Sequence, residues 1–144
     1  MSTRKLANAE QSDVCQLTGD LDKIEQAAAG AGLTLIRIDL KGLASKAGLL
    51  GRVARALNFP DWFGKNWDAL NDCLTDLSWL DGGGWVIIFE NSKHLAARKP
   101  QVFHSAVDVF QSANDYWRQA GKPFWVLFHG LNDWVTGLER FDGH

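Results

Sequence analysis

Three short apolar runs, rich in branched and aromatic residues, recur along the chain. They are Leu33–Leu40, Trp85–Phe89 and Phe124–Phe128. Unbroken apolarity over this length is typical of strands that are buried on both faces. Helix-like patterns lie between and after these runs, at Ser45–Leu57, Asn66–Leu77 and Val102–Gln119. This alternation favours an α/β fold, with a small parallel sheet of about three strands covered by helices and joined by right-handed crossovers.

The two ends of the chain carry weaker patterns. Val14–Thr18 and Leu21–Ala31 indicate a short strand and an alanine-rich helix, so residues 13–32 are expected to add an edge strand and a covering helix. Residues 1–12 are polar and are expected to be disordered. The tail, residues 130–144, has one aromatic anchor, Trp134, and is expected to dock as a turn of helix. With 144 residues, 46% of them hydrophobic, residues 13–144 are expected to form a single domain.

The helix expected at Asn66–Leu77 has one apolar and one acidic side. Its apolar stripe recurs at i, i+3, i+7 and i+10, and consists of Trp67, Leu70, Leu74 and Leu77. The opposite side carries Asp68, Asn71, Asp72 and Thr75. Asn66 is a natural N-cap, and Asp68 falls in the first turn, where the helix dipole favours an acid. The carboxylates are therefore expected to face outward.

Acidic residues concentrate around this helix. Between Asn58 and Gly83 there are five acids and one base, whereas the rest of the chain has fourteen bases and twelve acids. Asp68 and Asp72 repel each other at a cost of roughly 0.2 to 0.5 kcal/mol, and Asp76 lies unfavourably near the helix C-terminus. Local stability therefore does not explain them. Such a surface raises the encounter rate with a basic partner, although an ordinary solvated helix face is the alternative interpretation.

The motif around this helix resembles the signature of the barstar family, the intracellular inhibitors of secreted guanyl-preferring ribonucleases of the barnase type. The motif is F-P-D-W-F-G-K-N-W-D-A-L-N-D-C-L-T-D-L, from Phe59 to Leu77. The resemblance depends on Pro60, the aromatic pair after Asp61, Gly64, Asn66, the triplet Asp68-Ala69-Leu70, and Asp72. It extends less specifically from about Leu33 to about Phe128.

The resemblance implies a set of partner-binding residues. Trp62 stands where the family packs an aromatic residue against the enzyme. Asp68 and Asp72 correspond to the helix acids that enter the ribonuclease active site in place of substrate phosphate, and Thr75 matches a further contact position. The barnase–barstar complex is itself the standard example of electrostatic steering and of one dominant interfacial aspartate. Asn71 and Asp76 complete the candidate surface.

Three positions depart from the family pattern. The family has a tryptophan at the position of Asn71, an aromatic residue at that of Leu77, and an acid on a later helix at that of Ser112. These departures are compatible with a partner other than barnase. They are also compatible with an interface reshaped around Asp76 or Trp79, although a Trp79 folded over the core is favoured.

Catalysis is the less favoured interpretation of the same residues. Asp68 and Asp72 could act as an acid–base pair or bind a hard metal ion with the help of His94, His104 or His129. The chain contains no C-x-x-C, H-E-x-x-H, G-x-S-x-G or P-loop motif. We therefore expect no catalysis, cofactor or metal. His104 and Asp108, at i and i+4, are expected to form a surface helix pair.

Location and partners follow from cysteines, charge and hydropathy. Cys15 and Cys73 are the only thiols, and they are expected to be free in a reducing compartment. No segment has the apolarity of a signal peptide or membrane span, so the protein is expected in the cytoplasm. The net charge of −2 disfavours direct RNA binding. The expected function is inhibition of a basic, barnase-type ribonuclease. The alternatives are an interaction module for another basic protein and a small metal-dependent hydrolase.

Overall fold

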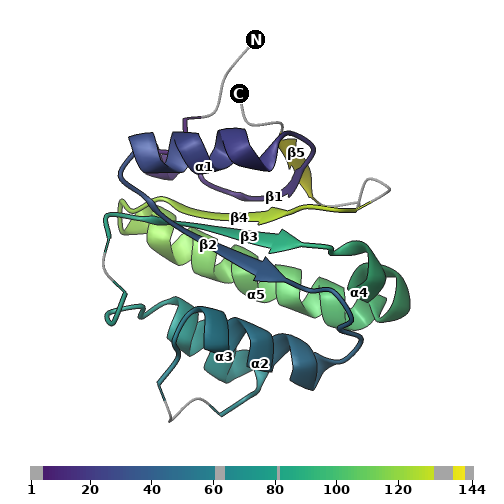
Figure 1. Ribbon diagram of the computed structural model, residues 1–144. Helices are drawn as coiled ribbons and strands as arrows, with labels where there is room; N and C mark the ends of the chain where they lie inside the picture. The colour runs from purple at the N-terminus through teal and green to yellow at the C-terminus, as the bar shows by residue number, and fades with distance from the viewer. Residues whose placement is uncertain (1–4, 61–63, 81, 132–137, 142–144) are drawn as a thin grey trace.

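A five-stranded sheet, parallel at every strand pairing, organises the described part of the chain (Figure 1). The computed structural model describes residues 5–60, 64–80, 82–131 and 138–141. In spatial order the strands are β2 (Thr34–Asp39), β3 (Trp85–Glu90), β4 (Phe124–Phe128), β1 (Val14–Leu17) and β5 (Glu139–Phe141). The three expected apolar runs form β2, β3 and β4, side by side. The α/β class is confirmed, and the expected count of about three strands was too low.

Strand β1 is not the edge strand that the sequence led us to expect. It pairs with β4 through Val14 and Val126, and on its other side with β5 through Gln16 and Arg140. All four residues of β1 are buried, which fits a strand with neighbours on both sides. The described end of the tail contains the outer strand β5, and the turn of helix expected for the tail stays a prediction. Trp134 lies outside the described residues.

The helices agree with the predicted pattern apart from two features. They are α1 (Leu21–Gly30), α2 (Lys46–Ala56), α3 (Trp67–Leu74), α4 (Lys93–Arg98) and α5 (Pro100–Gln119). Helix α4 was not predicted. Helix α3 is shorter than expected, because Leu77 adopts a left-handed conformation (φ 48°) and the N–H groups of Asp76 and Leu77 both bond to the Cys73 carbonyl. This turn directs Leu77 into the core, where it is 1% exposed.

Helices cover both faces of the sheet. Helix α1 lies over one face, and α2, α3 and α5 lie over the other (Figure 1). Alternate residues of each strand enter two separate cores. Ile87 and Phe89 of β3 join the core under α3 and α5, whereas Val86 and Ile88 join the core under α1. The N-terminal helix and the acidic helix α3 are therefore on opposite sides of the sheet.

Residues 5–12, part of the segment that was expected to be disordered, have a defined structure. Leu6 is buried, and its carbonyl accepts a hydrogen bond of 2.9 Å from the indole Nε1 of Trp125. A short 3-10 helix follows at Ala9–Gln11, and the buried Ser12 hydroxyl donates to the Ala9 carbonyl at 2.6 Å. The polar composition concealed this docking. A buried indole needs a hydrogen-bond acceptor, and the Leu6 backbone supplies it.

Both cysteines are buried, and no disulfide joins them, as expected. Cys15 belongs to the core under α1, and Cys73 lies on α3. The sheet separates them. Within the described ranges, no helix combines the length and apolarity that crossing a membrane requires.

Candidate functional site

Helix α3 is fixed at both of its ends. At its start the Asn66 side chain accepts a hydrogen bond of 2.7 Å from the Ala69 N–H, which confirms the predicted N-cap. At its end the Leu74 carbonyl accepts a bond of 2.7 Å from Nε1 of Trp117 on α5. Between these two ends, the buried side chains of Leu70 and Leu74 pack into the core. The outward side chains of α3 therefore project from a rigid base.

Three carboxylates are exposed along α3 and the turn after it, and we call them the acidic face: Asp68, Asp72 and Asp76. Among the described residues, salt bridges join Arg37 to Glu25 and Glu90, and Arg118 to Asp115, and none was found at the acidic face. The nearby ammonium of Lys46 lies over the Trp67 ring, 5.2 Å from its centroid. No ion pair with another described residue neutralises the acidic face. Helix α1 does not cover it, because α1 lies on the other side of the sheet.

The buried Cys73 thiol reports the electrostatics of this helix. Its pKa is raised to about 11, first by burial and then by the neighbouring charges of Asp72 and Asp76. A thiolate here would lose hydration and would also face two carboxylates. The negative potential of the acidic face therefore extends into the protein beneath it.

The polar residues beside the acidic face are partly buried. The Thr75 hydroxyl donates to the Asn71 carbonyl at 2.9 Å, which closes the last turn of α3. The side-chain Oδ1 of Asn71 is buried and has no hydrogen-bond partner among the described residues. Asn71 also lines a hollow of about 280 Å³ between α3 and α5, which we call the α3–α5 hollow. Its walls are Trp67, Asp68, Asn71, Asp108, Val109 and Ser112.

The predicted binding residues are brought together on one helix and the turn that follows, with one exception. Trp62 lies outside the described residues. Trp79 is folded over the core, which was the favoured expectation over a role at the interface. Its Nε1 donates to the Leu57 carbonyl at 2.8 Å. Its ring packs edge-on against that of Phe59, with the two ring centroids 6.1 Å apart. Leu77 is buried, so the position that is aromatic in the family adds nothing to the surface here.

The histidines considered as catalytic or metal-binding partners of Asp68 and Asp72 do not come together at one place. His94 lies on α4, His104 on α5 and His129 directly after β4, and none of them lines the α3–α5 hollow. Among the described residues, no three His, Cys, Asp or Glu side chains lie close enough to hold a metal ion. Both His104 and Asp108 are exposed, but no hydrogen bond or ion pair was found between these two described residues. Their expected pairing is therefore not observed.

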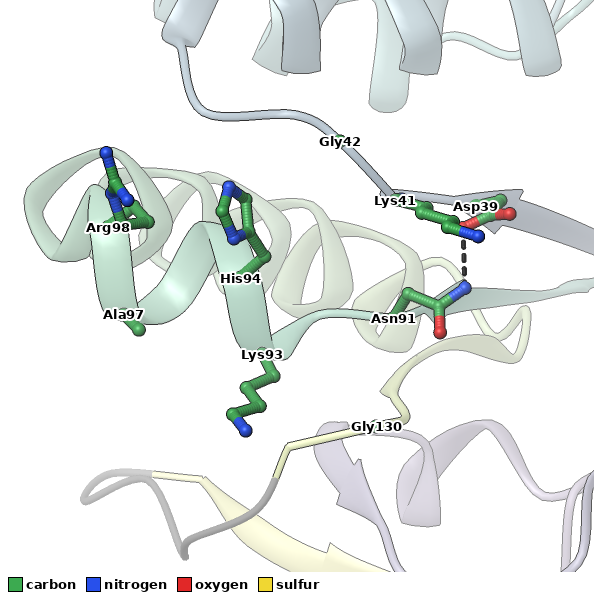
Figure 2. Close-up of a pocket in the computed structure, with 9 residues that line it drawn as sticks. All are labelled: Asp39, Lys41, Gly42, Asn91, Lys93, His94, Ala97, Arg98 and Gly130. Carbon is green, nitrogen blue, oxygen red and sulfur yellow. Dashed lines mark hydrogen bonds between the residues drawn. The ribbon is translucent and has the colours of Figure 1, made fainter.

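A larger hollow of about 780 Å³ lies at the carboxyl ends of β2, β3 and β4, where α/β proteins often bind ligands (Figure 2). No sequence pattern predicted this hollow, although Asp39 and Asn91 mark the strand ends. Asn91 donates to the Asp39 carboxylate at 2.7 Å, and this bond lowers the pKa of Asp39. Figure 2 shows Lys93 pointing away from His94 and Arg98. Because these basic side chains do not converge, the hollow makes no case for an anion site.

Comparison with known proteins places the acidic helix in a family context. A family model described as Barstar (barnase inhibitor) matches residues 33–129, about two thirds of the chain. The chain belongs to the barstar family. The matched region begins just before β2 and ends just after β4, and it contains all of α3. Strand β1 and helix α1 precede it, so the barstar-family protein carries an N-terminal strand–helix extension.

Structural comparison adds information about the fold alone. The chain is similar to the ORC2 protein of Aeropyrum pernix, whose structure is described as ADPNP-ADP complexes, with a TM-score of 0.58 and 16% identity. The similarity covers 89% of this chain and only 37% of that one. At this identity the likeness concerns chain architecture. A comparison with curated proteins found no match.

Proposed function

We propose that this barstar-family protein binds a barnase-type ribonuclease and occludes its active site with the acidic face of α3. The observation that carries the proposal is the state of Asp68, Asp72 and Asp76. All three are exposed, and within the described ranges none makes a salt bridge. They project from a helix that is capped at its start and bonded to α5 at its end. Their negative charge is available to a partner.

The chemistry of the target suits this surface. An enzyme that cleaves RNA must hold phosphate with cationic side chains, and carboxylates accept strong charge-assisted hydrogen bonds from the same groups. Because α3 is rigid, little side-chain and backbone freedom is lost on association. In this proposal Asp68 and Asp72 imitate phosphates, Asp76, Asn71 and Thr75 border them, and Trp62 acts as an apolar anchor. The inhibitor performs no chemistry, needs no cofactor and does not bind RNA itself.

The proposed place of action is the cytoplasm. An inhibitor of a secreted ribonuclease protects the cell that makes the enzyme only if the two meet before export. The two cysteines form no disulfide, which suits a reducing compartment.

The experiment is a titration of the purified protein into a barnase-type ribonuclease, with RNA cleavage as the readout. Asp72→Ala should weaken inhibition by about 30-fold or more, since truncating one partner of a desolvated charge pair costs about 2 to 5 kcal/mol. The matched control is Asp22→Ala. Asp22 is an exposed acid in the first turn of α1, on the opposite side of the sheet. Equal effects of the two variants would contradict the proposal, because net charge alone would then explain the binding.

A barstar-like module with a different basic partner is the second candidate. It is favoured by the surface around α3, where Leu77 is buried and Ser112 carries no charge, so this surface differs from the family pattern. Absence of inhibition across several barnase-type ribonucleases would support it. Recovery of an unrelated basic protein from a lysate by the wild type, and not by Asp72→Ala, would identify the partner.

A further inference from the structure

We propose that the N-terminal segment, residues 5–12, positions the acidic face by fixing the part of α5 that holds the end of α3. The inference rests on the proposed function in one respect, because it treats the acidic face as the binding surface. It assigns Ser12 and Asn114 as positioning residues. Both are 1% exposed, so they act through α5 and not by touching the partner. Ser12 precedes the region that matches the family model, so the match gives the N-terminal segment no role.

The N-terminal segment is attached to the fold at both of its ends. Near its start, Leu6 belongs to the core under α1, and its carbonyl accepts the hydrogen bond from Nε1 of Trp125. At its end, Ser12 meets α5, which covers the other face of the sheet (Figure 1). The carbonyl of the next residue, Asp13, accepts a bond of 3.2 Å from the N–H of Val126. The N-terminal segment therefore links the two faces of the sheet beside β4.

A buried polar network joins this segment to the last turns of α5. The side-chain Nδ2 of Asn114 donates to the Phe124 carbonyl at 2.9 Å and to the Ser12 hydroxyl at 3.4 Å. The guanidinium of Arg118 donates to Oδ1 of Asn114, and at 3.4 Å to the Ser12 carbonyl. Leaving a buried polar group without its partner is costly, so these bonds favour one position and one rotation of α5 against β4.

The same stretch of α5 holds the end of α3. Trp117 comes three positions after Asn114, is buried, and donates from Nε1 to the Leu74 carbonyl at 2.7 Å. Because backbone hydrogen bonds keep a single helical turn nearly rigid, a shift of α5 at Asn114 also shifts Trp117 and the Leu74 carbonyl. Leu74 lies between Asp72 and Asp76 in the chain. Movement there therefore displaces two carboxylates of the acidic face.

This link matters for binding because it keeps the acidic face in one arrangement before a partner arrives. An end of α3 that can move must be ordered when the partner binds, and this ordering weakens the complex. The competing explanation is that Ser12 and Asn114 contribute to overall stability alone. In that case, any equally destabilising substitution in the N-terminal extension would weaken binding to the same extent. A chain of contacts does not by itself establish coupling, so the two explanations require a matched comparison.

The test compares Ser12→Ala with Ile24→Val in the full chain. Ser12→Ala removes the hydroxyl that bonds to Asn114 and to Ala9. Ile24→Val removes one methylene group from the core under α1, away from α5. Both variants should lower the urea midpoint by a similar, small amount. With the ribonuclease used above, Ser12→Ala should raise the Kd about fivefold and Ile24→Val less than about twofold.

A double-mutant cycle tests the route through Trp117. Trp117→Phe keeps an aromatic ring and removes the Nε1 donor to the Leu74 carbonyl. If the effect of Ser12 reaches the acidic face through that bond, adding Ser12→Ala to Trp117→Phe should change the Kd less than about twofold. Additive effects of the two substitutions would overturn the inference.

Hydrogen exchange of the Trp117 indole gives a readout that needs no partner. Its Nε1 proton bonds to the Leu74 carbonyl, and Trp117→Phe identifies its NMR signal among those of the seven tryptophans. Ser12→Ala should speed this exchange about fivefold and Ile24→Val less than about twofold. Equal exchange rates in the two variants would overturn the inference and leave the proposed function standing. The expected exchange rates in a protein that inhibits no ribonuclease would support the positioning of α3 and overturn the proposed function.

Discussion

Ile24 tests whether the N-terminal extension shares the core of the barstar fold. It lies on α1, is fully buried, and belongs to the core that contains Val86 and Ile88 of β3. Ile24→Ala removes three carbon atoms. At about 0.8 kcal/mol for each buried methylene-sized group, the lost transfer free energy is about 2.4 kcal/mol. The cavity left behind raises the expected loss in the free energy of unfolding to about 3 to 4 kcal/mol.

Urea unfolding, followed by tryptophan fluorescence and by far-UV circular dichroism, measures this loss. With a slope of about 2 kcal/mol per molar urea, the midpoint should fall by about 1.5 to 2 M in a single transition seen by both probes. Lys23→Ala, at the exposed neighbouring position, should shift it little. A loss below about 1 kcal/mol, or an early transition confined to part of the helical signal, would refute the idea of a shared core.

Three further predictions concern α3. Asn66→Ala should lower the free energy of unfolding by about 1 kcal/mol, because the Ala69 N–H loses its acceptor, whereas Asn66→Asp should retain the cap; urea midpoints decide this. The raised pKa of Cys73 means that the folded thiol stays protonated where the unfolded thiol ionises. Its contribution to stability is therefore complete below a pH of about 9 and is lost as the pH rises to about 11, and Cys73→Val should lack this loss in urea unfolding across that range. Finally, stopped-flow mixing with the ribonuclease should give an association rate constant that falls steeply between about 0.05 and 0.5 M salt, and a salt-independent rate would argue against steering by the acidic face.

The central strands were predictable because their apolar runs specify burial on both faces without reference to the rest of the chain. The position of β1 was not. Its four residues pair with β4 and β5, which come more than a hundred positions later, and sequence periodicity does not encode such pairings. Strand β5 has three residues, and of these Phe141 alone is buried. The sequence therefore has no apolar run there that would predict a strand. Helix α4 is similarly short and has one buried side chain, Leu95.

The acidic face was predictable for the same local reason. Helical spacing places Asp68 and Asp72 on one side of α3, and the cap at Asn66 fixes where that helix begins. The α3–α5 hollow was not predictable, because it depends on which turn of α5 packs against α3. The resemblance to the family places Ser112 where an acid is expected, but only the packing shows that Asp108 lines the same hollow.

The placement of β1 also has a consequence for shortened versions of the protein. A fragment confined to residues 33–129 would retain every aspartate of the acidic face, yet one backbone edge of β4 would be left without a neighbour. Apolar side chains now covered by α1 would also be exposed to water, among them Val86, Ile88, Trp125 and Leu127. An unpaired strand edge can pair with a strand of another chain, and exposed apolar surface beside it favours such association. Removal of the segment that carries β1 and α1 is therefore expected to promote aggregation, even though the acidic face would be intact.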